Sequence, residues 1–215
     1  MATKKAETIT IPELKLKDFT LRLVGDSPLI VHAWSEKAKK MMLDKQMKKA
    51  TTGKETRNPA VEYARSLYWL NPTIPKNLDE MSEEEIHDAI ADATFGFPVI
   101  AFKAAAVDAG YQQKILDKKT TARGAFHIIG GEYAVINGTP SPREDMVKIG
   151  MGTADLRFRA MFTEWSVELP IRYNSGAMSA EEIINLFNVA GFSNGVGEWR
   201  PSRDGDFGRF HVYTG

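Results

Sequence analysis

Residues 195–210, which read GVGEWRPSRDGDFGRF, contain the residue types best suited to chemistry in this chain. Four glycines lie within fourteen residues, with a tryptophan and three arginines among or beside them: Gly195, Gly197, Gly205, Gly208, Trp199, Arg200, Arg203 and Arg209. Glycine has no Cβ, so its backbone N–H approaches a ligand closely and its φ can be positive. A guanidinium group is planar and permanently charged, so it matches a phosphate and stacks on a base. The segment predicts a loop that grips an anionic backbone, and the alternative is a mobile connector.

The overall composition limits the classes of protein to consider. The chain has 215 residues, 43% of them hydrophobic, with 28 basic and 28 acidic residues and no cysteine. Zero net charge argues against binding nucleic acid through bulk charge, but it allows a local basic groove. The lack of cysteine excludes disulfides and thiolate metal sites. Because we also find no signal peptide and no membrane-length apolar run, we expect a cytoplasmic protein with no membrane partner, no metal and no cofactor.

The charges are segregated along the chain. Seven lysines lie between residues 36 and 54, and residues 79–92 are acidic. Four of the lysines form a predicted auxiliary basic groove: Lys37, Lys40, Lys45 and Lys48. The alternative for such a run is a solvated helix face.

Hydrophobic periodicity and capping residues predict the elements that would position these groups. Expected strands cover residues 19–24, 29–31, 155–162, 165–173 and 209–213, with a hairpin over 126–136 that turns at Gly130-Gly131. Expected helices cover residues 35–49, 60–67, 82–94, 98–110 and 180–190. Ser82 with Glu85 and Ser179 with Glu182 form capping boxes. Gly191 is placed to stop the last helix, and Pro170 suggests an edge or a bulge.

Without the segment 33–94, the predicted order of elements is β-α-β-β-α-β. This is the split βαβ arrangement of an α+β, ferredoxin-like (RRM-like) fold, in which two helices cover one face of a four-stranded antiparallel sheet. We therefore divide the chain into a flexible arm (1–16), a core (17–32 and 95–215) and a helical insertion (33–94). Arg157 and Arg159 would lie on the open sheet face if Leu156 and Phe158 face the helices.

Three motifs within this order resemble those of RAMP proteins, the ferredoxin-like subunits of CRISPR effector complexes. The glycine-rich loop of that family is similar to Gly195-Val-Gly with Gly205-Asp-Phe-Gly, located between the second helix and the last strand. The start of the family's first core helix resembles residues 97–103, and its opening strand resembles the segment that ends Ser27-Pro-Leu-Ile. The resemblance covers residues 17–32 and 95–213. Residues 143–159 and 197–201 also resemble small proteins of phage and prophage genomes.

The RAMP resemblance implies binding of single-stranded DNA or RNA, by copies that self-assemble side by side along the strand. The four loop glycines match the family's loop, Arg200, Arg203 and Arg209 match its basic positions, and Lys103 matches a basic position at the head of the first helix. We add Arg123, Arg157, Arg159 and Trp199 to the predicted nucleic-acid-binding residues. The acidic residues Glu198, Asp204 and Asp206 depart from the pattern. They favour a stand-alone phage protein over an effector subunit, or a loop that grips a neighbouring copy.

Two other functions remain open. Some RAMP relatives cleave RNA with a histidine near the first core strand and helix, so His32 and His127 are candidates for a metal-independent endoribonuclease. The alternative for both residues is a purely structural role. The balanced charge and the acidic segment 82–94 favour a third function, a phage protein that binds or mimics a host effector subunit.

Overall fold

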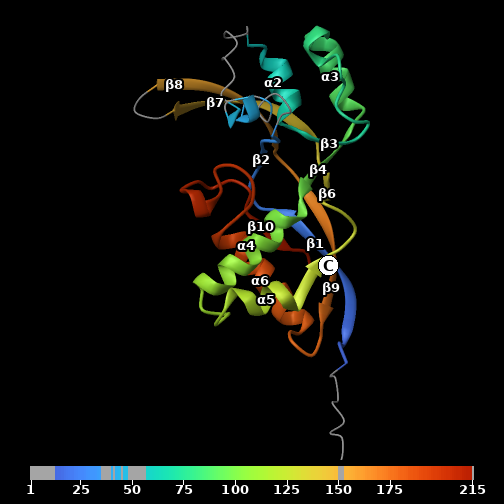
Figure 1. Cartoon of the computed structure of the whole chain (residues 1–215), viewed down its shortest axis with the longest axis vertical. Coiled ribbons are helices and arrows are strands. Elements are labelled where there is room, and N and C mark those ends of the chain that lie inside the picture. The colour runs from blue at the N-terminus through green and yellow to red at the C-terminus, as the bar shows by residue number, and fades with distance from the viewer. Residues whose placement is uncertain are drawn as a thin grey trace, which may run out of the picture.

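The central element of the fold is an antiparallel sheet (Figure 1). The computed structural model describes residues 13–34, 40, 42–44, 46–47, 57–149 and 153–214. The strands of the sheet are β1 (Leu16–Gly25), β3 (Tyr68–Asn71), β4 (Thr94–Pro98), β5 (Phe126–Ile128), β6 (Tyr133–Asn137), β9 (Ser166–Asn174) and β10 (Phe210–Val212). They are ordered β10-β1-β9-β6-β4-β3, and β5 also pairs with β9. β1 and β9 are the long central pair, in register from Leu16↔Asn174 to Val24↔Ser166.

Helices α4 (Val99–Gln112) and α6 (Ala180–Ser193) lie on the same side of this sheet (Figure 1). β9 alternates buried Val167, Leu169 and Ile171 with more exposed residues, so one sheet face packs on the helices and the other meets solvent. The chain runs β1, α4, β5/β6, β9, α6, β10, and β10-β1-β9-β5/β6 are neighbours in space. This order confirms the predicted ferredoxin-like α+β fold.

The expected hairpin over 126–136 is wrong. β5 and β6 do not pair with each other; both pair with β9, β5 near Ile171 and β6 near Val167. They are two halves of one strand position, separated by Gly130 and Gly131 at φ 96° and 135°. Ile129 donates its N–H to the carbonyl of Pro170 at 2.8 Å. Pro170 has no N–H to donate back to this neighbouring strand. The irregularity expected at Pro170 is therefore a break in the neighbouring strand.

A second, three-stranded sheet stands apart from the first, with β8 at its centre. Its strands are β2 (Leu29–Val31), β7 (Pro140–Ile149) and β8 (Thr153–Phe162), in the order β2-β8-β7. The prediction that Arg157 and Arg159 lie on the open face of the central sheet is therefore wrong. β8 pairs instead with β7 over ten residues, a strand that its two prolines and many charges concealed from pattern analysis.

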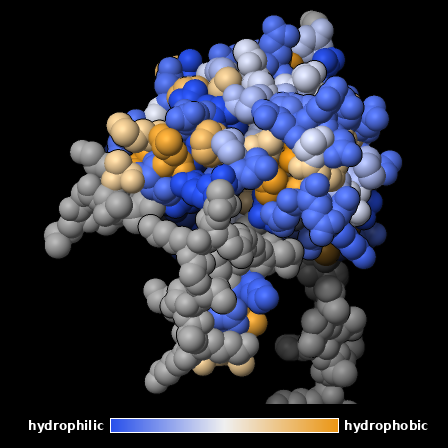
Figure 2. Space-filling model, turned by 90° about the horizontal axis from the view of Figure 1, so that it is seen from above, coloured by the Kyte–Doolittle hydropathy of each residue, from blue (hydrophilic) through white to orange (hydrophobic). Residues whose placement is uncertain are grey.

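The segment between β2 and β4 is only partly helical. It contains α2 (Pro59–Ser66), the 3-10 turn η1 (Leu78–Glu80) and α3 (Glu83–Ala91), but also the edge strand β3. α2 lies against β8. The end of the molecule that carries α2, α3 and the small sheet is largely hydrophilic, with small separate apolar patches (Figure 2). Of the predicted lysine groove, Lys40 is exposed, and Lys37, Lys45 and Lys48 lie outside the described residues.

The two predicted capping boxes are confirmed, but the predicted helix end at Gly191 is not. Both capping boxes form, at Ser82 with Glu85 and at Ser179 with Glu182. The prediction that Gly191 ends the last helix is wrong, because α6 continues to Ser193. No helix in the described part of the chain is both long and apolar enough to cross a membrane.

Candidate functional site

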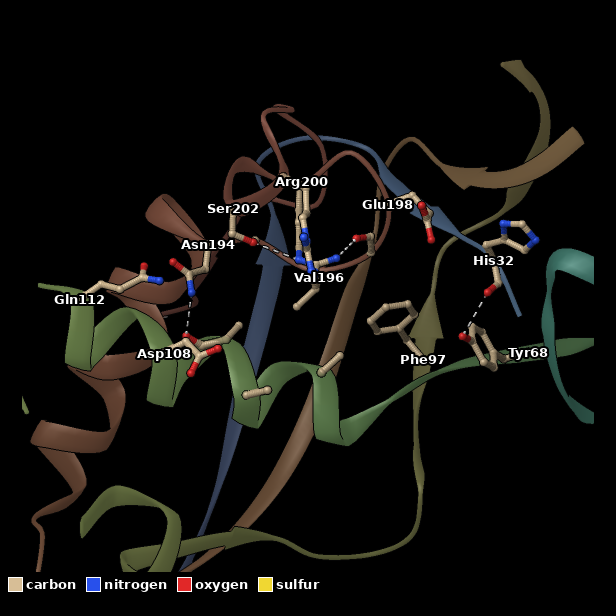
Figure 3. Close-up of a pocket in the computed structure, with 16 residues that line it drawn as sticks. His32, Tyr68, Phe97, Asp108, Gln112, Asn194, Val196, Glu198, Arg200 and Ser202 are labelled. Carbon is tan, nitrogen blue, oxygen red and sulfur yellow. Dashed lines mark hydrogen bonds between the residues drawn. The ribbon is translucent and has the colours of Figure 1, made fainter. Parts of the chain in front are cut away.

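A cleft of about 380 Å³ separates the glycine loop, residues 194–208, from α4 (Figure 3). Its floor consists of three small residues on α4: Ala101, Ala104 and Ala105. One end is lined by His32, Tyr68, Phe97 and Glu198, and the other by Asp108, Gln112, Asn194 and Ser202. Arg203 also belongs to the lining. An apolar floor with polar groups at both ends is the usual composition of a ligand site.

The glycine loop is fixed to the second sheet by its backbone. Gly195, Gly197 and Gly208 have φ of 61°, 81° and 65°, in the left-handed region that favours glycine. A Cβ on Gly197 would lie 2.5 Å from the carbonyl oxygen of Ile30. The N–H of Glu198 donates to that same oxygen at 2.9 Å, and the N–H of Gly208 donates to Pro28 at 2.8 Å. The glycines therefore permit the close approach that holds the loop beside the cleft.

Trp199 projects from this loop in an unusual backbone conformation. Its φ is 52°, and bulky residues seldom adopt positive φ. Its carbonyl accepts a hydrogen bond from the Phe207 N–H at 3.0 Å, and a Cβ on Gly205 would lie 2.8 Å from the Trp199 Cα. The side chain nevertheless remains 41% exposed. Backbone strain that presents an exposed aromatic ring is typical of a binding loop.

The three loop arginines are in different states. Arg200 donates to the Gly197 carbonyl at 2.7 Å and to the Ser202 hydroxyl at 3.0 Å, so it braces the loop. Arg209 pairs with Asp206, with 2.8 Å between Nε and Oδ1. Arg203 is an exposed residue of the cleft lining, and its side chain has no hydrogen bond or ion pair within the part of the chain that the structure describes. Arg203 is therefore the loop arginine available to a phosphate.

The two arginines predicted on β8 are both engaged in ion pairs. Arg159 is only 7% exposed; its Nη1 lies 3.3 Å from Asp145 Oδ2, and its Nε donates to His32 Nδ1 at 3.3 Å. Arg157 pairs with Asp155 at 2.8 Å. Arg159 thus lies behind the cleft, where it orients His32, and does not face a ligand.

His32 lines the cleft as a neutral imidazole. Burial, followed by the nearby Arg159 charge, lowers the pKa of His32 below its ordinary value. Because Arg159 donates to Nδ1, the ring's proton is on Nε2. The imidazole therefore offers one N–H donor.

This shift predicts a pH dependence of stability. A lowered folded pKa means that the unfolded chain binds the proton more readily, so the contribution of His32 is complete above the ordinary pKa of about 6.5 and is lost as the pH falls toward the folded value. We expect the free energy of unfolding, measured by urea denaturation, to drop between about pH 7.5 and about pH 5.5, less so in His32→Gln. An equal drop in both proteins would contradict this role of His32.

Lys103, Arg123 and His127 come together at a second place, outside the lining of the cleft. Lys103 Nζ donates to the Arg123 carbonyl at 2.9 Å, near the end of α5 (Lys119–Ala125), and lies 3.4 Å from His127 Nδ1. Burial lowers the pKa of Lys103. Since Arg123 contributes its carbonyl, this contact satisfies helix-terminal backbone rather than forming a guanidinium site.

Sequence reasoning missed most of the cleft lining. The alanine-rich stretch of α4 was a usable signal, since small residues on one helix face allow another group to lie close. The polar residues Gln112, Asn194 and Ser202 carry no motif and are brought together only by the packing of α4 against α6.

Comparisons with known proteins give little beyond this geometry. No family model matches the chain, and no curated protein matches it. Among solved structures, the chain is similar to Cmr6 from Pyrococcus furiosus, with 12% sequence identity and a TM-score of 0.38 over 93% of this chain and 99% of that one.

Proposed function

We propose that the protein binds single-stranded DNA or RNA along the cleft between the glycine loop and α4, as a RAMP-type protein would. The observation that carries the proposal is the loop itself. Its fixed backbone contributes Arg203 to the cleft lining, with a side chain that has no partner among the described residues, and it leaves the ring of Trp199 exposed. A cation for phosphate and an aromatic ring for a base are the two contacts that single strands need.

A second exposed aromatic residue supports the proposal. Trp34 lies two residues after His32 in sequence and is 63% exposed. Every base offers a flat face on which an exposed tryptophan ring can stack. Self-assembly along the strand belongs to the same proposal, because repeated copies would each take a short stretch of nucleotides.

The charges indicate how such binding would respond to salt. At the cleft, Asp108 is neutralised by Lys119 at 2.8 Å and Arg200 is held within the loop, so Arg203 is the main cation facing a strand. Counterion release scales with the phosphates that a protein neutralises. We therefore expect a shallow salt dependence, with stacking supplying much of the affinity.

The decisive experiment compares Arg203→Ala with Arg172→Ala. Arg172 lies on the solvent face of the central sheet and is paired with Asp18 at 2.7 Å, so it is a matched cation away from the cleft. Single-stranded DNA and RNA would be titrated by fluorescence anisotropy at several salt concentrations. Arg203→Ala should weaken binding and reduce the slope of log affinity against log salt by about one, and Arg172→Ala should leave both unchanged.

Two results would count against the proposal. If neither nucleic acid binds at low salt, the protein is not a single-strand binder. If Arg172→Ala alone reduces the slope, the strand lies on the opposite face of the sheet and the cleft is not its site.

A binding role accounts for the histidines better than a ribonuclease role. Abstraction of a proton requires a free ring nitrogen. Nδ1 of His32 accepts from Arg159, so Nε2 of that ring holds the proton. His32 is therefore not set up as a general base, and His127 lies outside the cleft beside Lys103.

A further inference from the structure

His32, Tyr68, Phe97 and Glu198 lie together at one end of the cleft, which we call the recess (Figure 3). Tyr68 and Phe97 pack edge to face, with 5.9 Å between ring centroids, and Phe97 is 5% exposed. These two rings are therefore held in place by the core. The alanines of α4 continue the apolar surface from Phe97 along the floor.

Glu198 is an unexpected residue in a site for a polyanion. Its backbone N–H is bound to Ile30, but its carboxylate makes no hydrogen bond or ion pair within the described part of the chain. It is half-buried and close enough to His32 to act on that imidazole electrostatically. The Glu198 carboxylate oxygens are in contact with solvent, so water hydrates them in the free protein. The carboxylate would repel phosphate, and a ligand that replaces this water must bring hydrogen-bond donors.

His32 supplies the complementary group at the same end of the cleft. With Nδ1 taken by Arg159, its Nε2–H remains as a donor. The recess therefore offers one N–H donor and a carboxylate with two acceptor oxygens beside an apolar floor. These groups are complementary to a planar ring whose edge carries one acceptor next to two donors.

We infer that this recess binds one unstacked guanine of the bound strand. The carboxylate of Glu198 accepts from guanine N1–H and N2–H, His32 Nε2–H donates to O6, and the ring lies over the alanine floor. The inference rests on the proposed function, because the guanine belongs to the single strand that the cleft holds.

The four bases differ in how well they complete this pattern. Adenine presents one donor and one acceptor on the Watson–Crick edge, and cytosine and uracil each present one donor and two acceptors. Each of these bases therefore satisfies a single carboxylate oxygen. Guanine presents two adjacent donors and engages both oxygens, as bidentate recognition requires. Hypoxanthine, the base of inosine, keeps O6 and N1–H but lacks the N2 amino group. The difference in affinity between guanine and hypoxanthine therefore measures the contribution of the hydrogen bond from N2–H.

The size of the cleft agrees with this arrangement. A volume of about 380 Å³ falls within the range of pockets that enclose small ligands. With the base at the aromatic end, the sugar and phosphate extend toward Ser202 at the other end, and Arg203 belongs to the same cleft lining. One nucleotide thus spans the cleft from Glu198 to Ser202.

The test uses oligouridines of about 12 nucleotides, in ribose and deoxyribose form, with one central residue changed to G, A, C or inosine. We expect the G oligomer to bind about ten-fold more tightly than the A oligomer, with inosine between them, since each charge-assisted hydrogen bond contributes about that factor. Glu198→Gln should abolish the preference for G, so that oligomers with G, A or C at the central position bind with equal affinity. Glu168→Gln, on the solvent face of β9, should retain the preference.

The possible failures are distinct. Equal affinity for all central bases, or a preference for G that persists in Glu198→Gln, overturns the guanine assignment and leaves single-strand binding intact. No binding of any oligomer at low salt overturns the proposed function itself. A preference for G over inosine that disappears only in Glu198→Gln supports the inference.

Discussion

Gly191→Ala should destabilise the protein by about 3 kcal/mol, at the upper end of the cost of overpacking. α6 lies directly on β10, and a Cβ on Gly191 would collide with the Phe210 carbonyl oxygen and lie 2.6 Å from its carbonyl carbon. Those atoms are backbone, and Phe210 is 1% exposed, so neither partner can move without displacing β10 from β1. A displacement of α6 would also move the glycine loop at the cleft, because the loop follows α6 directly.

Gly124→Ala is the matched control, since both substitutions add one methyl group to a helical glycine. A Cβ on Gly124 in α5 meets no atom within 4 Å. Relief of glycine's chain entropy should stabilise that variant by about 0.5–1 kcal/mol. Urea denaturation at neutral pH measures both free energies. If the two variants were equally stable, the close contact between α6 and β10 would be refuted.

Asp145→Ala should cost about 3–5 kcal/mol of unfolding free energy, the usual result of removing one partner from a buried ion pair. Asp145 is 8% exposed and receives both Arg159 at 3.3 Å and Arg143 Nε at 2.8 Å. Without the carboxylate, the guanidinium of Arg159 stays buried with His32 Nδ1 as a weak neutral acceptor.

The exposed pair of Asp18 with Arg172 provides the comparison for this effect. Both side chains are about half exposed and their charges are screened by solvent, so Asp18→Ala should destabilise the fold far less than Asp145→Ala. The double variant Asp145→Ala/Arg159→Leu should recover part of the loss, because it leaves no buried charge without a partner. Thermal and urea unfolding measure all three variants. If Asp145→Ala cost no more than Asp18→Ala, the buried network would not stabilise the fold.

Much of the fold was predictable because it depends on short-range signals. The capping boxes at Ser82 and Ser179 determine where two helices begin, and both require residues only three positions apart. The alternation of β9 and the order of elements were enough to predict the split βαβ core. The glycine spacing likewise indicated a loop with left-handed residues between α6 and β10.

Long-range pairing was not predictable from such signals. Gly130-Gly131 resembles a hairpin turn, yet β5 and β6 both pair with β9, and that choice depends on a strand about 40 residues away in sequence. Gly191 resembles a helix stop, yet it is required by the carbonyl of Phe210 on another element. The glycine pair at 130–131 thus has positive φ without forming a hairpin, and Gly191 is required by a neighbour distant in sequence.

The sequence by itself determined the ferredoxin-like order of elements and the glycine loop with its arginines, because backbone preferences and hydrophobic alternation act over a few residues. Only the tertiary structure decided which cations are available. Arg159 is neutralised by Asp145 and bound to His32, a residue 127 positions away, whereas Arg203 faces the cleft. Charge availability depends on contacts in space, and the same packing brings Glu198, His32 and the alanines of α4 together around one recess.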